Sequence, residues 1–231
     1  MIELHHDTPP PRLLEDRRLL DIPDGPSNPR RAWNNFSTTG KTDIHNRLIP
    51  LQSGLCIYCE QKLDKYGFHI EHILSKLLNR PLTFEYTNLS LSCIKDGSIS
   101  TETTANPISC GHAPLKRAND YNETLLIKPT EAHCSELFAY HQNGEIKSND
   151  NNSGFDRTRV EHTLKVLNLN CLRLKRERRE VLDEGYGVIF DLQDDKEALK
   201  YFFNLEFEKV HNRYQSPFIS TRKEHYSLWI E

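Results

Sequence analysis

The segment His69-Ile70-Glu71-His72 packs two imidazoles and a carboxylate into four residues. Bringing such groups together is costly unless they bind a metal ion or move a proton. Glu71 offers a hard oxygen ligand that suits Mg²⁺ or Mn²⁺. His72 suits general-base work, because the unperturbed pKa of histidine lies near neutrality. His69 could be a further metal ligand, a substrate contact or a hydrogen-bonded strand histidine, and the sequence leaves these three interpretations open.

Two cysteines precede this segment. Cys56 and Cys59 have the Cys-x2-Cys spacing of a zinc knuckle, and Cys93 and Cys110 could complete a tetrahedron of four thiolates. The 16 residues between Cys93 and Cys110 make the second pair looser than usual, but closing a longer loop costs little additional entropy. We interpret the four cysteines as a structural Zn²⁺ site, and four unrelated buried thiols are the alternative.

The composition limits the class of protein. With 231 residues and 36% apolar content, the chain can bury one sizeable core, or one core with a small appended module. Its formal net charge of −3 gives no overall attraction to nucleic acid, so a local basic patch or a partner would have to supply it. No apolar run approaches the ~20 residues that cross a bilayer. The N-terminal residues lack the plan of a signal peptide. We therefore expect a cytoplasmic protein with no membrane partner and no disulfides, in which Cys134 and Cys171 are core residues.

The elements around the two clusters are predicted to form a ββα unit between about residues 55 and 120. A helix is expected to start at Thr42 or Asp43, although Pro50 is a local objection to it. Residues 68–73 and 88–93 have strand patterns, and Pro114 fits the first turn of a helix that runs to about residue 119.

The predicted fold class is α+β, with three parts. Residues 1–45 form an extended, proline-rich arm and docking segment. Residues 46–120 form the metal-binding core. Residues 121–231 form an accessory region that contains a β-hairpin around Asn143-Gly144 and is otherwise mainly helical.

Finer expectations concern that accessory region. Residues 124–128 are predicted to form a strand, as are residues 137–141 and 145–148 on either side of the hairpin turn. Asn170 is expected to cap a helix. The outer face of that helix is predicted to carry four basic residues, Lys175, Arg176, Arg178 and Arg179. Such a run is more typical of a solvated helix face than of a phosphate-binding surface.

The motifs around Cys56-x2-Cys59, His69-Ile70-Glu71-His72, Asn88-Leu89 and Cys110-Gly111-His112 resemble the HNH nucleases of the PtuB type. These nucleases belong to Septu anti-phage systems and also accompany some retrons. The resemblance is clearest over about residues 46–118, so that residues 46–120 would be an HNH ββα-metal nuclease core. It implies metal-dependent hydrolysis of phosphodiester bonds, with DNA favoured over RNA. It also implies a PtuA-type ATPase partner, and in a retron setting the reverse transcriptase and its DNA–RNA product could join the complex.

The resemblance also implies roles for individual residues. Glu71 takes the position of the acidic ligand of a catalytic Mg²⁺ or Mn²⁺, and His72 that of the base that activates water. Asn88 takes the middle position of the motif, which steadies the loop and orients the base. His112 takes the last position, as a second ligand of the catalytic ion. The zinc set is Cys56, Cys59, Cys93 and Cys110.

One departure from the family pattern leaves the last ligand open. The last two cysteines are far apart here, and Gly111 stands between Cys110 and His112. Asn106 or Asn119 could therefore replace His112, which is the preferred choice. Further candidates for substrate binding are His69, Lys116 and Arg117.

Two other functions remain open at the level of sequence. The chain could be a zinc-stapled interaction module without catalytic activity, or a stand-alone restriction-type endonuclease. The sequence does not decide between DNA and RNA as the substrate.

Overall fold

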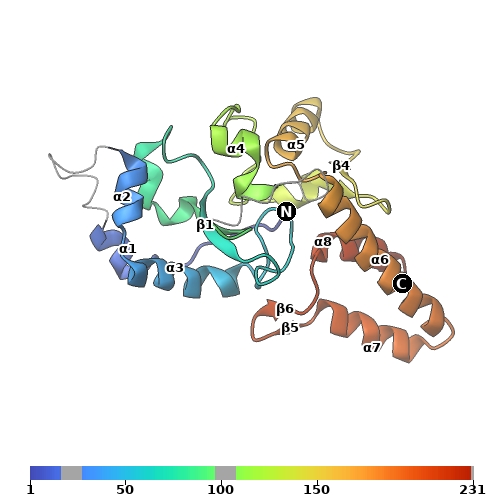
Figure 1. The fold of residues 1–231 in the computed structure, drawn as a ribbon. Helices are drawn as coiled ribbons and strands as arrows, with labels where there is room; N and C mark the ends of the chain where they lie inside the picture. Colours follow the sequence, from blue (N-terminus) through green and yellow to red (C-terminus); the bar gives the residue numbers. More distant parts are fainter. Residues whose placement is uncertain (17–27, 97–107, 230–231) are drawn as a thin grey trace.

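The computed structural model describes residues 1–16, 28–96 and 108–229. The fold is mixed α+β, as expected. A short β-ribbon lies near the centre, with α1, α2 and α3 on one side of it and α6, α7 and α8 on the other (Figure 1). Three two-stranded antiparallel sheets are present among these residues, and none is extended by a third strand.

The central ribbon consists of β1 (Phe68–His72) and β2 (Leu89–Cys93). The two strands are antiparallel, with Phe68 opposite Cys93 and Glu71 opposite Ser90. Both predicted strands are confirmed to within one residue. Every residue of β2 is buried, because the chain covers both of its faces. The register places Cys93 at one end of the ribbon, with His69 beside it, and places Glu71 and His72 at the other end.

Helix α3 (Thr38–Leu51) leads into this ribbon. Its N-cap is Ser37, whose Oγ accepts a hydrogen bond from the backbone N–H of Gly40 at 3.1 Å. The predicted start at Thr42 or Asp43 is therefore wrong by about one turn. Pro50 lies in the last turn, and the backbone N–H of Gln52 still bonds to the Leu48 oxygen, so the helix reaches Leu51 despite the proline.

The described part of the predicted arm differs from an extended segment. It contains the short helices α1 (Pro11–Asp16) and α2 (Pro29–Asn35), and each begins at a proline, whose fixed φ suits the first helical position. Leu4 and Leu13 are buried in the main core. Trp33 of α2 packs against Phe84, with ring centroids 5.7 Å apart. The arm residues that the structure describes therefore pack against the core.

Short 3₁₀ helices and one α-helix complete the core region. They are η2 (Arg80–Phe84), η3 (Tyr86–Asn88), η5 (Cys110–His112) and α4 (Pro114–Ala118). The predicted helix at Pro114 is confirmed, and it ends at Asn119, which has the left-handed backbone of a C-cap.

The accessory region contains the predicted hairpin, formed by β3 (Phe138–Tyr140) and β4 (Ile146–Ser148). It follows η6 (Cys134–Leu137), and Cys134 is buried, as is Cys171. The predicted strand at 124–128 is wrong. The backbone N–H of Ile127 donates to the Thr163 hydroxyl instead of joining a sheet.

The helices that follow are α5 (Gly154–Val166), α6 (Leu172–Leu192), α7 (Lys196–Phe207) and α8 (Ile219–Tyr226), with a small ribbon of β5 (Lys209–Val210) and β6 (Arg213–Tyr214) and the terminal η7 (Ser227–Trp229). Two expectations fail at the start of α6. Cys171 is the N-cap residue, and the Asn170 side chain bonds the backbone of Ile146. Arg178 is buried, not on the outer face, and donates to the backbone oxygens of Gly144 and Leu169.

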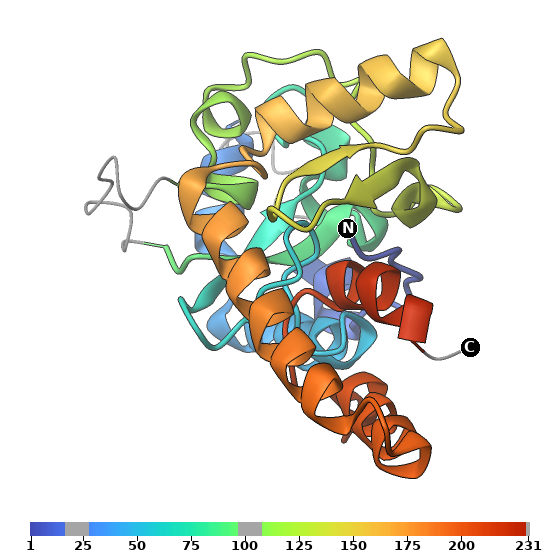
Figure 2. The same ribbon diagram turned by 90° about the vertical axis from the view of Figure 1, so that its right-hand side faces the viewer.

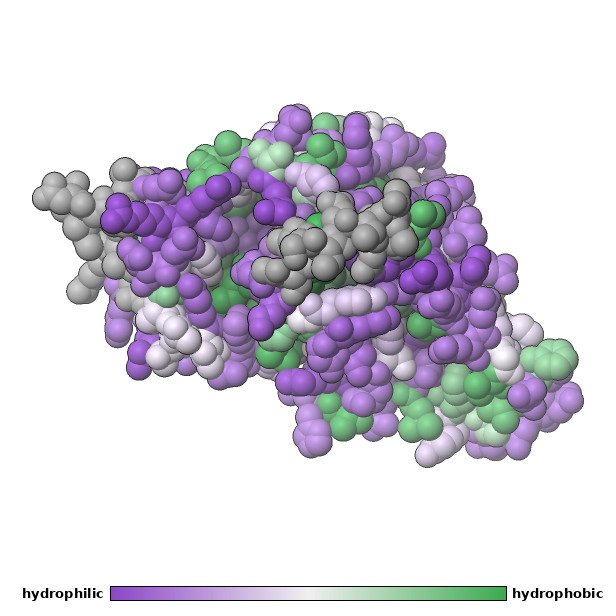
Figure 3. All heavy atoms as spheres, in the orientation of Figure 1, coloured by the Kyte–Doolittle hydropathy of each residue, from purple (hydrophilic) through white to green (hydrophobic). Residues whose placement is uncertain are grey.

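The C-terminal half of α6 and α7 extend away from the body of the molecule (Figure 2). They pack on each other through a small second core, which includes Leu182, Ile189, Leu199 and Phe203. The surface seen in Figure 3 is largely hydrophilic, with apolar residues scattered over it and one group of them toward the lower right, over α6 and α7. Among the described residues, no helix combines the length and apolarity needed to span a bilayer.

Candidate active site

Four cysteine sulfurs meet beneath the central ribbon. The Sγ atoms of Cys56, Cys59, Cys93 and Cys110 lie within 4.8 Å of one another, and all four side chains are buried. Cys59 and Cys93 have their sulfurs 3.6 Å apart and are free thiols. A tetrahedron of Zn–S bonds of about 2.3 Å would separate the sulfurs by about 3.8 Å. The donor set and its spacing therefore fit a zinc ion, and the four predicted ligands do come together.

Local backbone geometry turns the chain at the sulfurs. Glu60, directly after Cys59, and Cys110 itself both have left-handed backbones, with φ of 64° and 62°. The Glu60 carboxylate is buried and accepts hydrogen bonds from the backbone N–H and hydroxyl of Ser220. The backbone N–H of Cys93 lies 3.2 Å from the Cys56 sulfur. Buried carboxylate and amide contacts thus fix the loops that carry the thiols.

The Arg173 guanidinium lies near the four thiols. Its guanidinium donates to the Ser109 hydroxyl at 2.8 Å, next to Cys110, and to Glu177. Burial lowers the pKa of Arg173, but the neighbouring thiolates outweigh burial and raise it. A positive charge at this place stabilises the negative charge that four thiolates would bring, even when they share a divalent ion.

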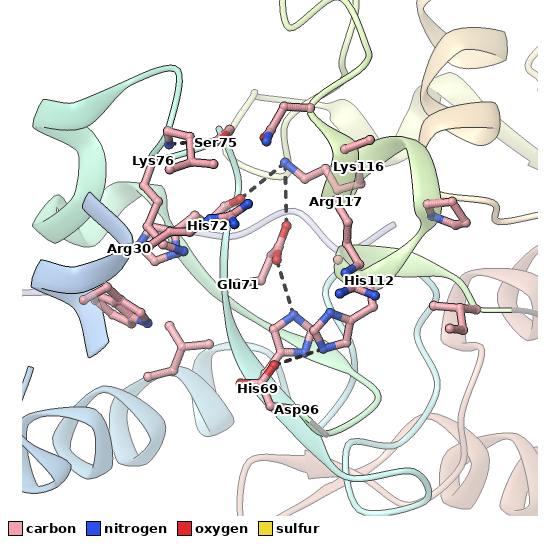
Figure 4. Close-up of a pocket in the computed structure, with 18 of the residues that line it drawn as sticks. Arg30, His69, Glu71, His72, Ser75, Lys76, Asp96, His112, Lys116 and Arg117 are labelled. Carbon is pink, nitrogen blue, oxygen red and sulfur yellow. Dashed lines mark hydrogen bonds and ion pairs between the residues drawn. The ribbon is translucent and has the colours of Figure 1, made fainter. Parts of the chain in front are cut away.

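A second cluster occupies an open pocket of about 830 Å³ beside the cysteines (Figure 4). Strand β1 supplies His69, Glu71 and His72, and η5 supplies His112, two residues after Cys110. A hydrogen bond ties the backbones that carry the two clusters. The Ser92 hydroxyl, next to Cys93, accepts from the backbone N–H of Gly111, which stands between Cys110 and His112.

Glu71 is the buried acid of the pocket. Its carboxylate lies 3.6 Å from the Lys116 ammonium and 3.3 Å from the Nε2 atom of His69, and it accepts from the Tyr58 hydroxyl. Burial alone would raise the pKa of Glu71. The Lys116 charge and the His69 contact outweigh burial and lower this pKa to about 2. Glu71 is therefore ionised at neutral pH.

His69 and His112 stack face to face, with ring centroids 3.8 Å apart. The Nε2 atom of His112 lies 3.2 Å from an Asp96 carboxylate oxygen. One ligand atom from each of His69, Asp96 and His112 lies within 4.8 Å of the others, a spacing that could hold a metal ion. Asp96 was not among the predicted site residues, because it stands in a turn without a motif and only the fold brings it here.

His72 is held in one orientation. Its Nε2–H can donate to the backbone oxygen of Thr83 at 3.0 Å, which leaves the Nδ1 lone pair facing the Lys76 ammonium at 3.2 Å. The ring also meets Trp33 edge to face, with centroids 4.5 Å apart. Burial, and then the Lys76 charge, lower the pKa of His72 to about 3. His72 is therefore neutral and able to accept a proton.

Asn88 lies beneath the loop that follows His72. Its Oδ1 accepts from the backbone N–H of Leu74 at 2.8 Å, and its Nδ2 donates to the backbone oxygens of Leu74 and Leu82. Both partners lie next to residues of the His72 environment, Ile73 on one side and Thr83 on the other. These contacts hold together the loop after His72 and the backbone before Thr83.

The two basic residues of α4 differ in direction. Lys116 is buried, and its ammonium faces Glu71. The same ammonium donates to the Ile73 backbone oxygen and the Tyr121 hydroxyl. Lys116 therefore supports the site from inside the protein and does not face the solvent. Arg117 is exposed and lines the pocket. Two further cations, Arg30 and Lys76, also line it. They are not among the predicted site residues, because Arg30 lies in the predicted arm and Lys76 in no motif.

Two of the three candidates for the last ligand, His112 and Asn119, lie among the described residues. Asn119 lines the same pocket from the end of α4, but it is not part of the group that could hold a metal ion. Asn106 lies outside the described residues. His112 is in that group.

Comparison with known proteins adds independent information. No family model matches the chain. Two curated proteins are similar to it. "Retron Vc95 putative HNH endonuclease" of Vibrio cholerae serotype O1 biovar El Tor is 30% identical over 146 residues, which cover 62% of this chain and 65% of the relative. "Retron Ec83 putative HNH endonuclease" of Escherichia coli is 28% identical over 204 residues, which cover 74% and 77%.

These relatives support an HNH nuclease family. The chain spans slightly less than two thirds of the length of the first relative. HNH nucleases are metal-dependent, and the two groups of metal-binding residue types described above agree with that property.

Proposed function

We propose that this chain is a metal-dependent HNH endonuclease that hydrolyses phosphodiester bonds of nucleic acid, with DNA favoured. One observation carries the proposal. Glu71 and His72 at the end of β1 and His112 on η5 open into one pocket, directly beside a buried cluster of four cysteines. Such an enzyme needs an acid, a base and metal-binding side chains in one pocket, and a structural metal site beside them to hold them in place.

The proposed ββα-metal core consists of β1, β2 and α4. The ribbon presents Glu71 and His72, and the segment from Cys110 through α4 presents His112 and Arg117. In this proposal Cys56, Cys59, Cys93 and Cys110 hold Zn²⁺. Because Cys110 and His112 are two residues apart, the zinc site would fix the position of His112.

The donor groups fit a divalent ion in the pocket. The resemblance assigns the catalytic Mg²⁺ or Mn²⁺ to Glu71 and His112. The Nε2 atom of His112 is buried and lies 3.2 Å from an Asp96 carboxylate oxygen, an arrangement that a divalent ion could share. When bound, such an ion would polarise the scissile phosphate and stabilise the leaving oxygen.

The residues of the chain perform the proton transfer. Thr83 and Trp33 hold the His72 ring so that Nδ1 faces the pocket side occupied by Lys76. An entering phosphate oxygen would attract the Lys76 ammonium and release Nδ1, which then accepts a proton from the attacking water. Moving that cation away from His72 also raises the pKa of His72 toward neutrality, because the charge of Lys76 is one of the causes that lower it.

Substrate binding is assigned to the cations of the pocket rim. Arg30, Lys76 and Arg117 line the pocket and provide a local positive surface on a chain whose net charge is −3. Cleavage is expected to leave a 5′-phosphate and a 3′-hydroxyl.

The proposed setting is an anti-phage defence complex in the cytoplasm. Both similar proteins carry retron names. We assign the chain to the PtuB type of effector subunit, with a PtuA-type ATPase as its partner, and with retron reverse transcriptase and its DNA–RNA product as further components. The formal net charge of −3 is the reason for expecting that a partner helps to capture nucleic acid.

The test is cleavage of supercoiled plasmid and of RNA by the zinc-loaded protein, alone and with its genomic neighbours, in Mg²⁺ or Mn²⁺. Metal-dependent cleavage that His72→Ala abolishes, with an unchanged zinc content, supports the proposal. Zinc binding without cleavage of either substrate under any of these conditions would favour the non-catalytic interaction module instead.

A further inference from the structure

Three side chains of the pocket form a donor set that differs from the one the HNH motif gives. The motif points to Glu71 and His112. In the structure, His69, Asp96 and His112 each have a ligand atom within 4.8 Å of the others, and Asp96 comes from the turn after β2, outside every motif.

The first observation concerns the proton on His69. Its Nδ1 lies 2.9 Å from the backbone oxygen of Ile94, which can only accept, so Nδ1 carries a proton and donates it. In the neutral ring Nε2 then has a lone pair. That lone pair lies 3.3 Å from a carboxylate oxygen of Glu71, which is also an acceptor. A second proton on His69 or a metal ion must resolve this contact. A carbonyl that fixes the far nitrogen is the usual support of a metal-binding histidine.

The second observation concerns His112. Its Nε2 atom is buried and lies 3.2 Å from an Asp96 carboxylate oxygen. An imidazole nitrogen and a carboxylate oxygen held this close are a suitable pair of ligands for a divalent ion. The His69 and His112 rings are stacked with their centroids 3.8 Å apart. One ion could therefore bind a nitrogen of each ring together with the Asp96 carboxylate.

The third observation is the close packing of Glu71 and His69 against Gly111. A Cβ atom at this position would lie 2.5 Å from a Glu71 carboxylate oxygen and 2.8 Å from the His69 Nε2 atom. No left-handed backbone explains this glycine, since its φ is not in the positive range. The missing side chain therefore lets the Glu71 oxygen and the His69 nitrogen lie directly against the backbone that precedes His112.

We propose that His69, Asp96 and His112 bind a first-row divalent transition-metal ion, and that Glu71, neutralised by Lys116, lies beside this ion without being its main protein ligand. Two imidazoles and one carboxylate favour Mn²⁺ and later metals over Mg²⁺, which prefers oxygen ligands. This inference rests on the proposed function, because the ion would serve the same active site. Figure 4 shows the three side chains gathered at one end of the pocket, with Lys116 at the opposite end of Glu71.

The experiment measures Mn²⁺ binding to the full, zinc-loaded chain by the electron paramagnetic resonance signal of free Mn²⁺. The variants are His69→Gln, Asp96→Asn, Gly111→Ala and Glu71→Gln, with His141→Gln as an exposed control. Wild type should bind one Mn²⁺ per chain more tightly than Mg²⁺, measured by competition. His69→Gln, Asp96→Asn and Gly111→Ala should raise the Kd by at least about 10-fold, and Glu71→Gln should change it less than Asp96→Asn does.

Asp96→Asn makes the test independent of folding, because the Asp96 side chain is 80% exposed. An unchanged Kd in Asp96→Asn with loss of binding in Glu71→Gln would overturn the inference, as would Mg²⁺ competing on equal terms. Mn²⁺ binding that depends on Asp96 in a chain that cleaves no nucleic acid would uphold the metal site and refute the nuclease. Mg²⁺-dependent cleavage, together with unchanged binding of Mn²⁺ and Mg²⁺ in Asp96→Asn, would uphold the nuclease and refute the metal site.

Discussion

Replacing Lys116 with methionine should destabilise the fold strongly, because it leaves the Glu71 carboxylate buried without its cation. The two groups are 3.6 Å apart, and their side chains are only 4% and 9% exposed. Removing one partner of a buried ion pair costs about 3–5 kcal/mol. The ammonium also donates to the Ile73 backbone oxygen and the Tyr121 hydroxyl, which would lose a donor.

The pKa of Glu71 gives the same order of magnitude. It falls from 4.5 to about 2, and each pKa unit corresponds to about 1.36 kcal/mol, so ionised Glu71 contributes about 3 kcal/mol. Since the folded-state pKa is the lower one, this contribution is complete above pH 4.5 and is lost as the pH falls toward 2. Acid would also protonate the cysteines, so replacing Glu71 with glutamine at neutral pH is the cleaner way to remove its charge.

The assay is urea unfolding of the zinc-loaded protein at pH 7. Lys116→Met should lower the free energy of unfolding by about 3–5 kcal/mol, and adding Glu71→Gln should recover a large part of that loss. The control is Lys147→Met, which breaks an exposed pair with Glu145 and should cost less than about 1 kcal/mol. Equal effects of Lys116→Met and Lys147→Met would refute the assignment of Lys116 as an internal brace.

Three further predictions concern the cysteines, the base and the accessory region. Cys110→Ser should reduce bound zinc below one ion per chain and lower the melting temperature, measured by metal analysis and calorimetry; full zinc occupancy would contradict the four-thiolate site. Lys76→Met should raise the pKa of His72 above about 3, measured by NMR titration, because it removes one of the two main causes of the depression; an unmoved pKa would show that Lys76 does not cap Nδ1. Arg178→Met should lower the free energy of unfolding by about 3 kcal/mol, since it removes two charged hydrogen bonds to buried carbonyls. The control Arg179→Met, at an exposed side chain, should change it by no more than about 0.5 kcal/mol. Equal effects of the two variants in urea unfolding would show that Arg178 does not fix the hairpin.

The sequence predicts the parts of this molecule that depend on residue type and short spacing. The strands at β1 and β2 follow from alternating and apolar runs, and the convergence of Cys56, Cys59, Cys93 and Cys110 follows from the chemistry of thiols in a motif. The hairpin follows from Asn143-Gly144, whose turn preference is local.

Contacts between distant segments were not predictable in the same way. Asp96 reaches His112 because the turn after β2 lies beside η5, and no local pattern encodes that approach. Arg178 lies in a basic run that indicates a solvated face, yet the carbonyls of the hairpin give it buried partners. Lys116 is similar, because the fold places a buried carboxylate within reach of what looks in sequence like a phosphate-binding residue.

The segment 124–128, which was wrongly predicted as a strand, shows a third reason why sequence-based prediction fails. Its composition suits a strand, but no described edge of a sheet is placed beside it, and its backbone bonds to a side chain of α5 instead. Propensity for β structure has an effect only where a partner strand exists.

The most direct test of the central claim is chemical rescue of the base. Deleting the imidazole in His72→Gly leaves a slot bounded by Trp33 and the Thr83 carbonyl, into which free imidazole could fit. In zinc-loaded protein under the conditions where wild type cleaves, His72→Gly should cleave about 10²- to 10⁴-fold more slowly. Added imidazole should restore part of that rate in a saturable manner. In the control variant Gly111→Ala, which keeps His72, added imidazole should leave the rate of cleavage unchanged. Cleavage by His72→Gly at the wild-type rate, or a loss of rate that imidazole does not restore, would contradict the role of His72 as the proton acceptor.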